Sequence, residues 1–210
     1  MRYLAAYYVT LIAAWVGAWY LHDLTSISDF SPGATFAYWT VAKLIVWIAP
    51  ILLIVSRVLG QPPVEYLGLV RLRQGVLVGL AVGAMFVALM AVIDAFTRAH
   101  ALPNLTWPTL NALVVAPVSE EVVFRGFALK ALEDSGWRFW PANGIAAVLF
   151  LGLHLPGWQF TRGLNSSSIV PALSVVVVGM GAGYAKHRAN CTWASVTVHF
   201  LNNSYSAFLR

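Results

Sequence analysis

The chain has 210 residues, of which 60% are apolar or aromatic and only 10% are charged, with a net charge of +5. Soluble domains usually carry about 25% charged residues, and a soluble core of this length does not hide so much apolar surface from water. The composition therefore excludes a disordered protein, a nucleic-acid-binding module and an ordinary cytosolic enzyme. It indicates a protein that crosses a membrane several times.

Seven apolar segments follow one another along the chain. A helix needs about 20 residues to cross the hydrocarbon core of a bilayer, and only helices or closed barrels satisfy their backbone polar groups in lipid. The segments lack the strict alternation of barrel strands, so they predict an all-α transmembrane bundle of about seven spans. In chain order they are Tyr3–Leu21, Phe36–Val58, Gly75–Phe96, Leu110–Leu132, Trp140–Leu155, Ile169–Ala185 and Thr192–Leu209.

Turn sequences rich in proline, glycine, serine and asparagine separate several of these segments. We expect connections at Ser31-Pro32-Gly33, at Gly60-Gln61-Pro62-Pro63, at Pro103-Asn104 and after Pro156-Gly157. The chain shows no long linker and no internal repeat. A single membrane domain over residues 1–210 is therefore expected.

The basic residues between the segments predict the orientation in the membrane, because cytoplasmic loops carry an excess of lysine and arginine. With the N-terminus in the cytoplasm, the outer side would hold Arg98, Arg162 and Arg210. The inner side would hold Arg2, Arg57, Arg71, Arg73, Lys130, Arg138, Lys186 and Arg188. We therefore expect an integral protein of the plasma (inner) membrane with a cytoplasmic N-terminus.

Charged residues inside the apolar segments are the first candidates for a function, because each costs at least about 2.5–3.5 kcal/mol on insertion scales. The fourth segment contains Glu120, Glu121 and Arg125. Glu121 and Arg125 are four residues apart, so they share a helix face and can pair. Glu120 is rotated by about 100° from Glu121 on a helix. We therefore predict that Glu120 is the unpaired, reactive carboxylate.

Polar side chains in the fifth and seventh segments extend this cluster. His154 lies near the end of the fifth segment, and His199 and Asn203 share one face of the seventh. At about 1.5 Å of rise per residue, Glu120, His154 and His199 fall within roughly 8 Å of membrane depth. Such a combination on three spans favours a functional site over isolated structural contacts. Lys43, inside the second segment, has two interpretations: it joins a polar network, or it extends toward the membrane interface, and the second is favoured.

The three clusters resemble the motifs of the CAAX prenyl protease type II and bacteriocin-processing family, also called CPBP or Abi. The Glu-Glu-x-x-x-Arg motif is similar to Glu120–Arg125, Phe-x-x-x-His to Phe150–His154, and His-x-x-x-Asn to His199–Asn203. The motifs occur in the family's order from about residue 110 onward. The resemblance implies an intramembrane endopeptidase with a catalytic core at about 110–210, acting on a membrane-associated peptide or protein in the lipid bilayer.

The resemblance also implies a role for each polar residue. Glu120 would be the general base that activates a water, and His154 would position that water or the scissile carbonyl. His199 and Asn203 would stabilise the oxyanion, because peptide hydrolysis needs donors aimed at the charge that develops there.

The dependence on a metal stays open at this point. Glu120, His154 and His199 would in principle form a His2Glu site for a divalent ion such as zinc. The chain lacks the His-Glu-x-x-His helix that is usual in zinc peptidases. We therefore expect a glutamate mechanism without metal or cofactor, in which Glu121 and Arg125 support the fourth helix.

Two other classes of function would use the same buried charges. A membrane transporter or proton-relay protein is one, and a non-catalytic immunity or scaffold protein is the other. Secondary transporters often contain inverted repeats with broken helices, and the sequence shows no such symmetry. The complete set of motif residues weighs against a scaffold, and no feature indicates nucleic acid as a partner.

Overall fold

The computed structural model describes residues 2–95 and 106–208. These residues form helices joined by short turns, and this part of the chain contains no β-strand, so the predicted all-α fold is confirmed. Five described segments are long and apolar enough to cross a membrane. The predicted ends at Phe96 and Leu209, the predicted turn at Pro103-Asn104, and Arg98 and Arg210 lie outside the described residues.

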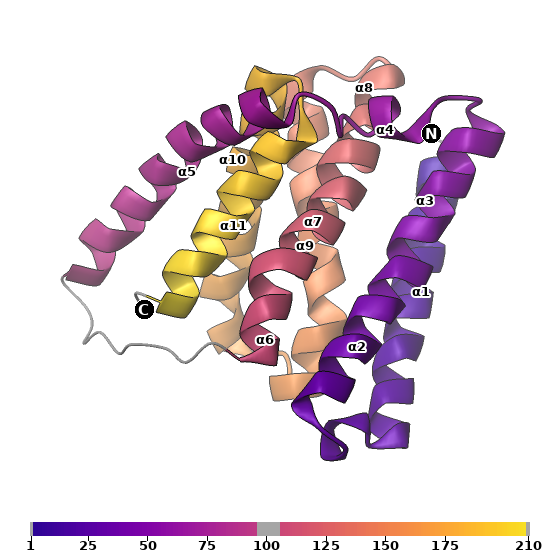
Figure 1. The fold of residues 1–210 in the computed structure, drawn as a ribbon, viewed down its shortest axis with the longest axis vertical. Helices are drawn as coiled ribbons and strands as arrows, with labels where there is room; N and C mark the ends of the chain where they lie inside the picture. Colours follow the sequence, from indigo (N-terminus) through magenta and orange to yellow (C-terminus); the bar gives the residue numbers. More distant parts are fainter. Residues whose placement is uncertain (1, 96–105, 209–210) are drawn as a thin grey trace.

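The helices of Figure 1 correspond to the seven apolar segments and to short connecting elements. They are α1 (Arg2–Thr25), α2 (Pro32–Lys43), α3 (Ala49–Leu53), α4 (Pro63–Tyr66), α5 (Leu72–Ala95), α6 (Trp107–Leu110), α7 (Ala116–Glu121), α8 (Lys130–Asp134), α9 (Phe139–Arg162), α10 (Ile169–Ala189) and α11 (Thr192–Phe208). Short 3-10 turns are η1 (Ile27–Asp29) and η6 (Ser166–Ser168). Turns of π-helix are η2 (Leu44–Ile48), η3 (Ile54–Val58), η4 (Asn111–Val115) and η5 (Val122–Leu129).

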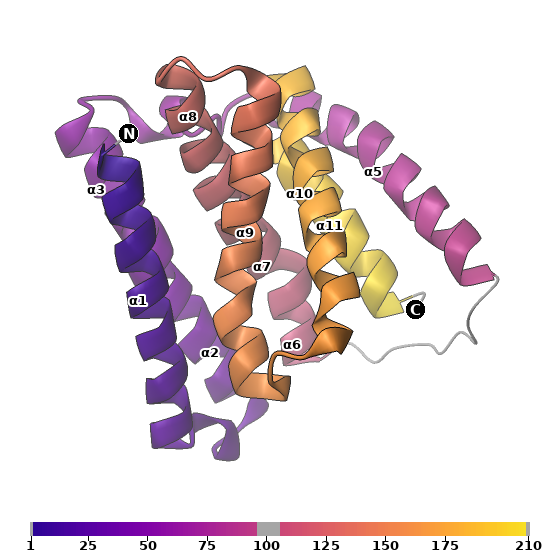
Figure 2. The ribbon, with the colours of Figure 1, turned by 180° about the vertical axis from the view of Figure 1, so that it is seen from behind.

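The helix that carries the predicted carboxylates lies in the middle of the bundle. Figures 1 and 2 show α7 between the flank formed by α1, α2 and α3 and the flank formed by α11 and α5, with α9 and α10 behind it in the view of Figure 1. Every residue of η5 is buried, and Phe124, Phe127 and Leu129 are fully so. Charged residues on this element therefore contact protein rather than lipid.

Glycines allow the close packing that holds α11 in place. Gly79 and Gly83 of α5 face α11, where a Cβ would lie 2.5 Å from Thr197 Cβ and 2.5 Å from Leu201 Cδ1, respectively. Small residues at such positions let membrane helices approach closely. In α10, a Cβ at Gly179 would lie 2.7 Å from the Arg125 guanidinium. The absence of a side chain at Gly179 therefore makes room for a buried charge.

Two predicted turn sequences have other roles in the structure. Ser31 caps α2 by accepting a hydrogen bond from the Ala34 amide at 3.1 Å, and Pro32 is the first helical residue. Serine before a proline is a helix start signal, so the second helix begins before Phe36. The prediction of a connection at Pro156 is wrong, because α9 continues through it to Arg162. Membrane helices tolerate internal proline when neighbouring groups satisfy the freed carbonyl.

Candidate active site

The central acidic cluster lies where α7 passes into the π-helical turn η5. Glu120 and Glu121 are the last two residues of α7, and Arg125 lies in η5. Turns of π-helix are rare and are frequent at functional sites. Arg125 Nη1 donates to Glu121 Oε1 at 3.0 Å, and both side chains are buried. The predicted pair therefore forms inside the bundle.

Glu121 also holds the histidine of α11. His199 Nδ1 lies 2.8 Å from Glu121 Oε1, and because a carboxylate only accepts, Nδ1 carries the proton. The other ring nitrogen, Nε2, lies 3.8 Å from Glu120 Oε2, which is too long for a hydrogen bond. The imidazole is thus placed between the two carboxylates. Glu121 positions His199 as well as Arg125, which the sequence did not indicate.

A backbone contact selects the tautomer of the second histidine. His154 Nδ1 lies 2.9 Å from the Phe150 carbonyl oxygen, which can only accept, so Nδ1 donates. In the neutral imidazole, Nε2 then keeps its lone pair. The Phe150 ring packs edge-on against His154 and His199, with centroids 4.7 and 5.7 Å away. The Arg125 guanidinium lies 4.6 Å from the same ring. The motif phenylalanine therefore contacts three of the polar groups.

Asn203 connects α11 to the helical segment that precedes the carboxylates. Its Nδ2 donates to the Ala112 carbonyl at 2.8 Å, and its Oδ1 accepts from Asn202 Nδ2 at 3.2 Å. The second N–H of the Asn203 amide is not used in these contacts. Asn203 therefore both fixes α11 against η4 and offers one donor beside His199.

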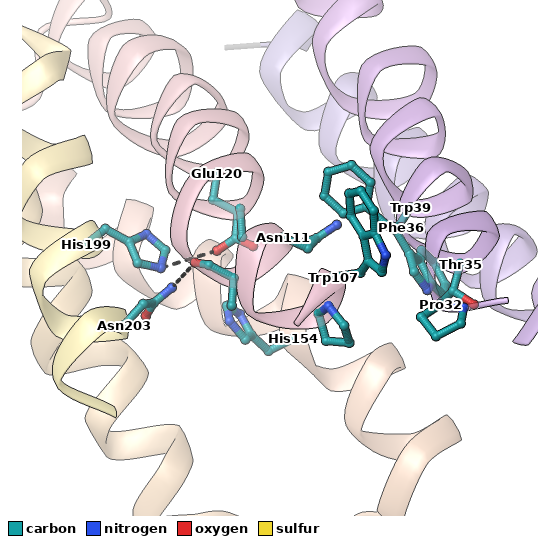
Figure 3. Close-up of a pocket in the computed structure, with 13 residues that line it drawn as sticks. Pro32, Thr35, Phe36, Trp39, Trp107, Asn111, Glu120, His154, His199 and Asn203 are labelled. Atoms are coloured by element: carbon teal, nitrogen blue, oxygen red, sulfur yellow. Dashed lines mark hydrogen bonds and ion pairs between the residues drawn. The ribbon is translucent and has the colours of Figure 1, made fainter. Parts of the chain in front are cut away.

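A cavity of about 630 Å³ joins these residues. Figure 3 shows Glu120, His154, His199 and Asn203 on one side of it, opposite aromatic side chains of α2 and α6. The aromatic side is formed by Phe36, Trp39 and Trp107. The four predicted catalytic residues thus meet at one cavity. Its mostly apolar wall with a few convergent polar groups is typical of a ligand site.

A smaller cavity of about 250 Å³ shares Glu120 and His154 with the first and is lined by Lys43 and several tryptophans. Only 6% of the Lys43 surface is exposed, and its Nζ donates to Asn111 Oδ1 at 3.0 Å. The expectation that Lys43 extends to the interface is therefore wrong. Sequence reasoning did not predict the contact between Lys43 and Asn111, although the position of Lys43 far from either end of the span Pro32–Val58 was a signal.

The alternative metal site would use Glu120, His154 and His199. Each histidine donates its Nδ1–H to a protein acceptor, which leaves Nε2 as the nitrogen that could bind a metal, as is usual for metal-binding histidines. Among residues 2–95 and 106–208, however, no group of three His, Cys, Asp or Glu side chains is arranged to hold a metal ion.

Comparison with known proteins identifies one family. The family model described as type II CAAX prenyl endopeptidase Rce1-like matches residues 102–205. The match contains Glu120, His154, His199 and Asn203, whereas Lys43 precedes it. A comparison with curated proteins finds no match.

Proposed function

Residues 102–205 belong to the type II CAAX prenyl endopeptidase Rce1-like family, and on this premise we propose that the protein is an intramembrane endopeptidase. It hydrolyses a peptide bond of a membrane-associated peptide or protein, in the plasma membrane, with its N-terminus in the cytoplasm. The observation that supports this most is the cavity at which Glu120, His154, His199 and Asn203 converge. Residues from three motifs that are separate in the sequence thus line the same cavity.

In the proposed reaction, Glu120 is the general base. Its carboxylate takes a proton from a water molecule while the water oxygen bonds to the scissile carbonyl carbon. His154 orients the water by accepting its other hydrogen at Nε2, since Nδ1 is occupied by the Phe150 carbonyl. A bare Nε2 accepts but does not donate, so His154 serves the water rather than the scissile carbonyl.

His199 and Asn203 stabilise the oxyanion that this attack creates. The Glu121 carboxylate accepts from His199 Nδ1 and holds the ring in place. When Nε2 carries a proton, this Nε2–H donates to the oxyanion. The free N–H of Asn203 supplies a second donor. When the intermediate collapses, the C–N bond breaks, the carbonyl re-forms, and Glu120 returns its proton to the leaving amine.

Cleavage by the purified protein in liposomes tests this proposal. We use a pool of membrane-associated peptides with and without S-prenylated cysteine, because the family name refers to prenyl substrates. In H₂¹⁸O, one heavy oxygen is expected in each new carboxylate, as identified by mass spectrometry. Proton flux, followed with a pH-sensitive dye, is expected to equal that of empty liposomes. Flux that depends on Glu120 and Glu121, without cleavage, would establish the transporter instead.

Metal removal gives a separate prediction. Because the described donors form no three-ligand site, we expect incubation with EDTA or 1,10-phenanthroline to leave the cleavage rate unchanged. Peptide hydrolysis by a carboxylate base needs no Lewis acid when the oxyanion has its own donors. Loss of activity that added zinc restores would contradict the metal-free mechanism and would assign Glu120, His154 and His199 as ligands.

A further inference from the structure

A third cavity, of about 120 Å³, reaches the two histidines of the proposed centre from another direction. Residues of α5, α9, α10 and α11 line it, among them Ser174, Asn202 and Ser206. It shares His154 and His199 with the cavity of about 630 Å³. None of its lining residues belongs to α2 or α6, which form the aromatic side of the larger cavity. The imidazoles therefore face two cavities that different helices enclose.

Polar side chains follow one face of α11 from the histidine toward the end of the helix. His199, Asn202 and Ser206 are spaced by three and four residues, as neighbours on one helix face are. At about 1.5 Å per residue, Ser206 lies about 3 Å and His199 about 14 Å along the axis from the last residue, Phe208. Ser206 is exposed, Asn202 is partly buried and His199 is buried. The third cavity thus extends from the helix end to a buried imidazole.

The side chains of this cavity can bind water. The Ser174 hydroxyl donates to the Val170 carbonyl at 3.0 Å and keeps its oxygen lone pairs as acceptors. Asn202 donates one N–H to Asn203 Oδ1 at 3.2 Å, and this contact uses neither its second N–H nor its own Oδ1. A buried water typically makes about three hydrogen bonds to such groups. Ser174, Asn202 and the Ser206 hydroxyl supply them from two facing helices.

The sizes of the two cavities suit different occupants. Pockets for drug-sized ligands usually measure about 300–1,000 Å³, which the cavity of about 630 Å³ matches. The third cavity, of about 120 Å³, has room for about four waters at about 30 Å³ each. A peptide that fills the larger cavity expels water from it, yet every hydrolysed bond consumes one water. The nucleophile therefore needs a polar space that the peptide does not occupy.

We propose that the third cavity stores the water that hydrolysis consumes and admits it to His154 between α10 and α11, while the peptide occupies the larger cavity. This assignment rests on the proposed endopeptidase function. Ser174, Asn202 and Ser206 hold the waters, and the foremost water passes to His154 Nε2 and Glu120. Its oxygen ends in the new carboxylate, so the cavity takes up one water from the helix end in each turnover.

Thiol labelling tests the hydration of the cavity without requiring cleavage. The full-length protein in nanodiscs is treated with 2-aminoethyl methanethiosulfonate, which attacks the thiolate that forms in water and not in lipid. We expect Ser174→Cys to react at least about tenfold faster than Leu173→Cys, although Leu173 is 61% exposed and one position nearer the start of α10. The native Cys191 is buried, and the unmodified protein gives the background. Equal rates for the two variants would overturn the proposal.

A bound peptide distinguishes the third cavity from the substrate cavity. In the Glu120→Gln background, a saturating peptide from the pool is expected to protect Thr35→Cys, because Thr35 lines the larger cavity. The labelling rate of Ser174→Cys is expected to stay unchanged. Protection of Ser174→Cys would place the peptide in the third cavity and contradict its role as a water store.

Filling the cavity connects it to the reaction. Ser174→Leu and Ser206→Leu, from different helices, are each expected to lower kcat at least about tenfold with KM unchanged, because only the nucleophile is displaced. Ser174→Ala keeps the volume open and is expected to lose less. Val177→Leu is the matched control with unchanged kcat, since Val177 is exposed on α10 and lines none of the three cavities. Unchanged kcat in both folded leucine variants would overturn the proposal, as would equal losses in Ser174→Ala and Ser174→Leu.

The two levels of inference fail separately in these measurements. Fast labelling of Ser174→Cys in a protein that hydrolyses no peptide contradicts the endopeptidase, while the hydrated cavity stands. Cleavage by a protein in which Ser174→Cys reacts no faster than Leu173→Cys contradicts the water store alone.

Discussion

Glu120→Gln is expected to lower kcat for peptide cleavage by about 10²–10⁴-fold, the usual contribution of a general base. The amide has nearly the shape of the carboxylate but does not accept a proton from water at neutral pH. Among the residues that the structure describes, Glu120 forms no hydrogen bond that joins two helices, and its ionic contact is with His199 at 3.8 Å. The variant is therefore expected to fold and to insert normally, with a melting temperature at or above that of the parent.

Glu65→Gln is the matched control for this substitution. Glu65 belongs to α4, is exposed, and lines neither of the two cavities that contain Glu120. The cleavage rate of Glu65→Gln is therefore expected to equal that of the unmodified protein. Initial rates on one cleaved peptide from the pool, with melting curves of both variants, provide the comparison. Activity of Glu120→Gln within a few-fold of the control would remove Glu120 from the role of base.

Five of the seven predicted spans correspond to described segments that are long and apolar enough to cross a membrane, because hydropathy reports burial in lipid directly. The fourth predicted span, which contains Glu120, Glu121 and Arg125, and the seventh are not among these five. Local signals at helix ends were harder to interpret. The sequence Ser31-Pro32 is compatible with both a turn and a helix cap. Proline usually ends or kinks a helix in soluble proteins, but Pro156 lies inside α9. The π-helical turns have no sequence pattern in this chain that distinguishes them from regular helix. Arg125 nevertheless lies in one of these turns, and Lys43 directly precedes another.

Helical spacing predicted the pairs that lie on one helix and missed the pairs between helices. Glu121 and Arg125 are four residues apart, and their contact follows from the helix repeat. The contact of Glu121 with His199 joins residues 78 positions apart, and that of Lys43 with Asn111 joins residues 68 apart. A single sequence carries no signal for such contacts. The similar membrane depth of the motif residues and the resemblance of the three motifs to one family were the clues to a shared site.

The buried ion pair between Glu121 and Arg125 is expected to contribute strongly to the stability of the fold. Arg125→Met is expected to lower the free energy of unfolding by about 3–5 kcal/mol, because it leaves the buried Glu121 without its strongest partner. The Arg125 side chain is fully buried and that of Glu121 is 1% exposed, so solvent compensates little for the lost partner. The double variant Glu121→Gln, Arg125→Met is expected to recover part of this loss, since two uncharged groups need no pairing. Titration with a denaturing detergent measures each value.

The same stretch of helix supplies the control for this prediction. Lys130 and Asp134 also pair at a spacing of four residues, but 36% and 39% of their side chains are exposed. Lys130→Met is therefore expected to change the free energy of unfolding by only about 0–1 kcal/mol, as solvent-exposed pairs do. If the two single variants lose equal stability, burial is not what makes the Glu121–Arg125 pair matter. The position of His199, which shares Glu121 with Arg125, would then need another support.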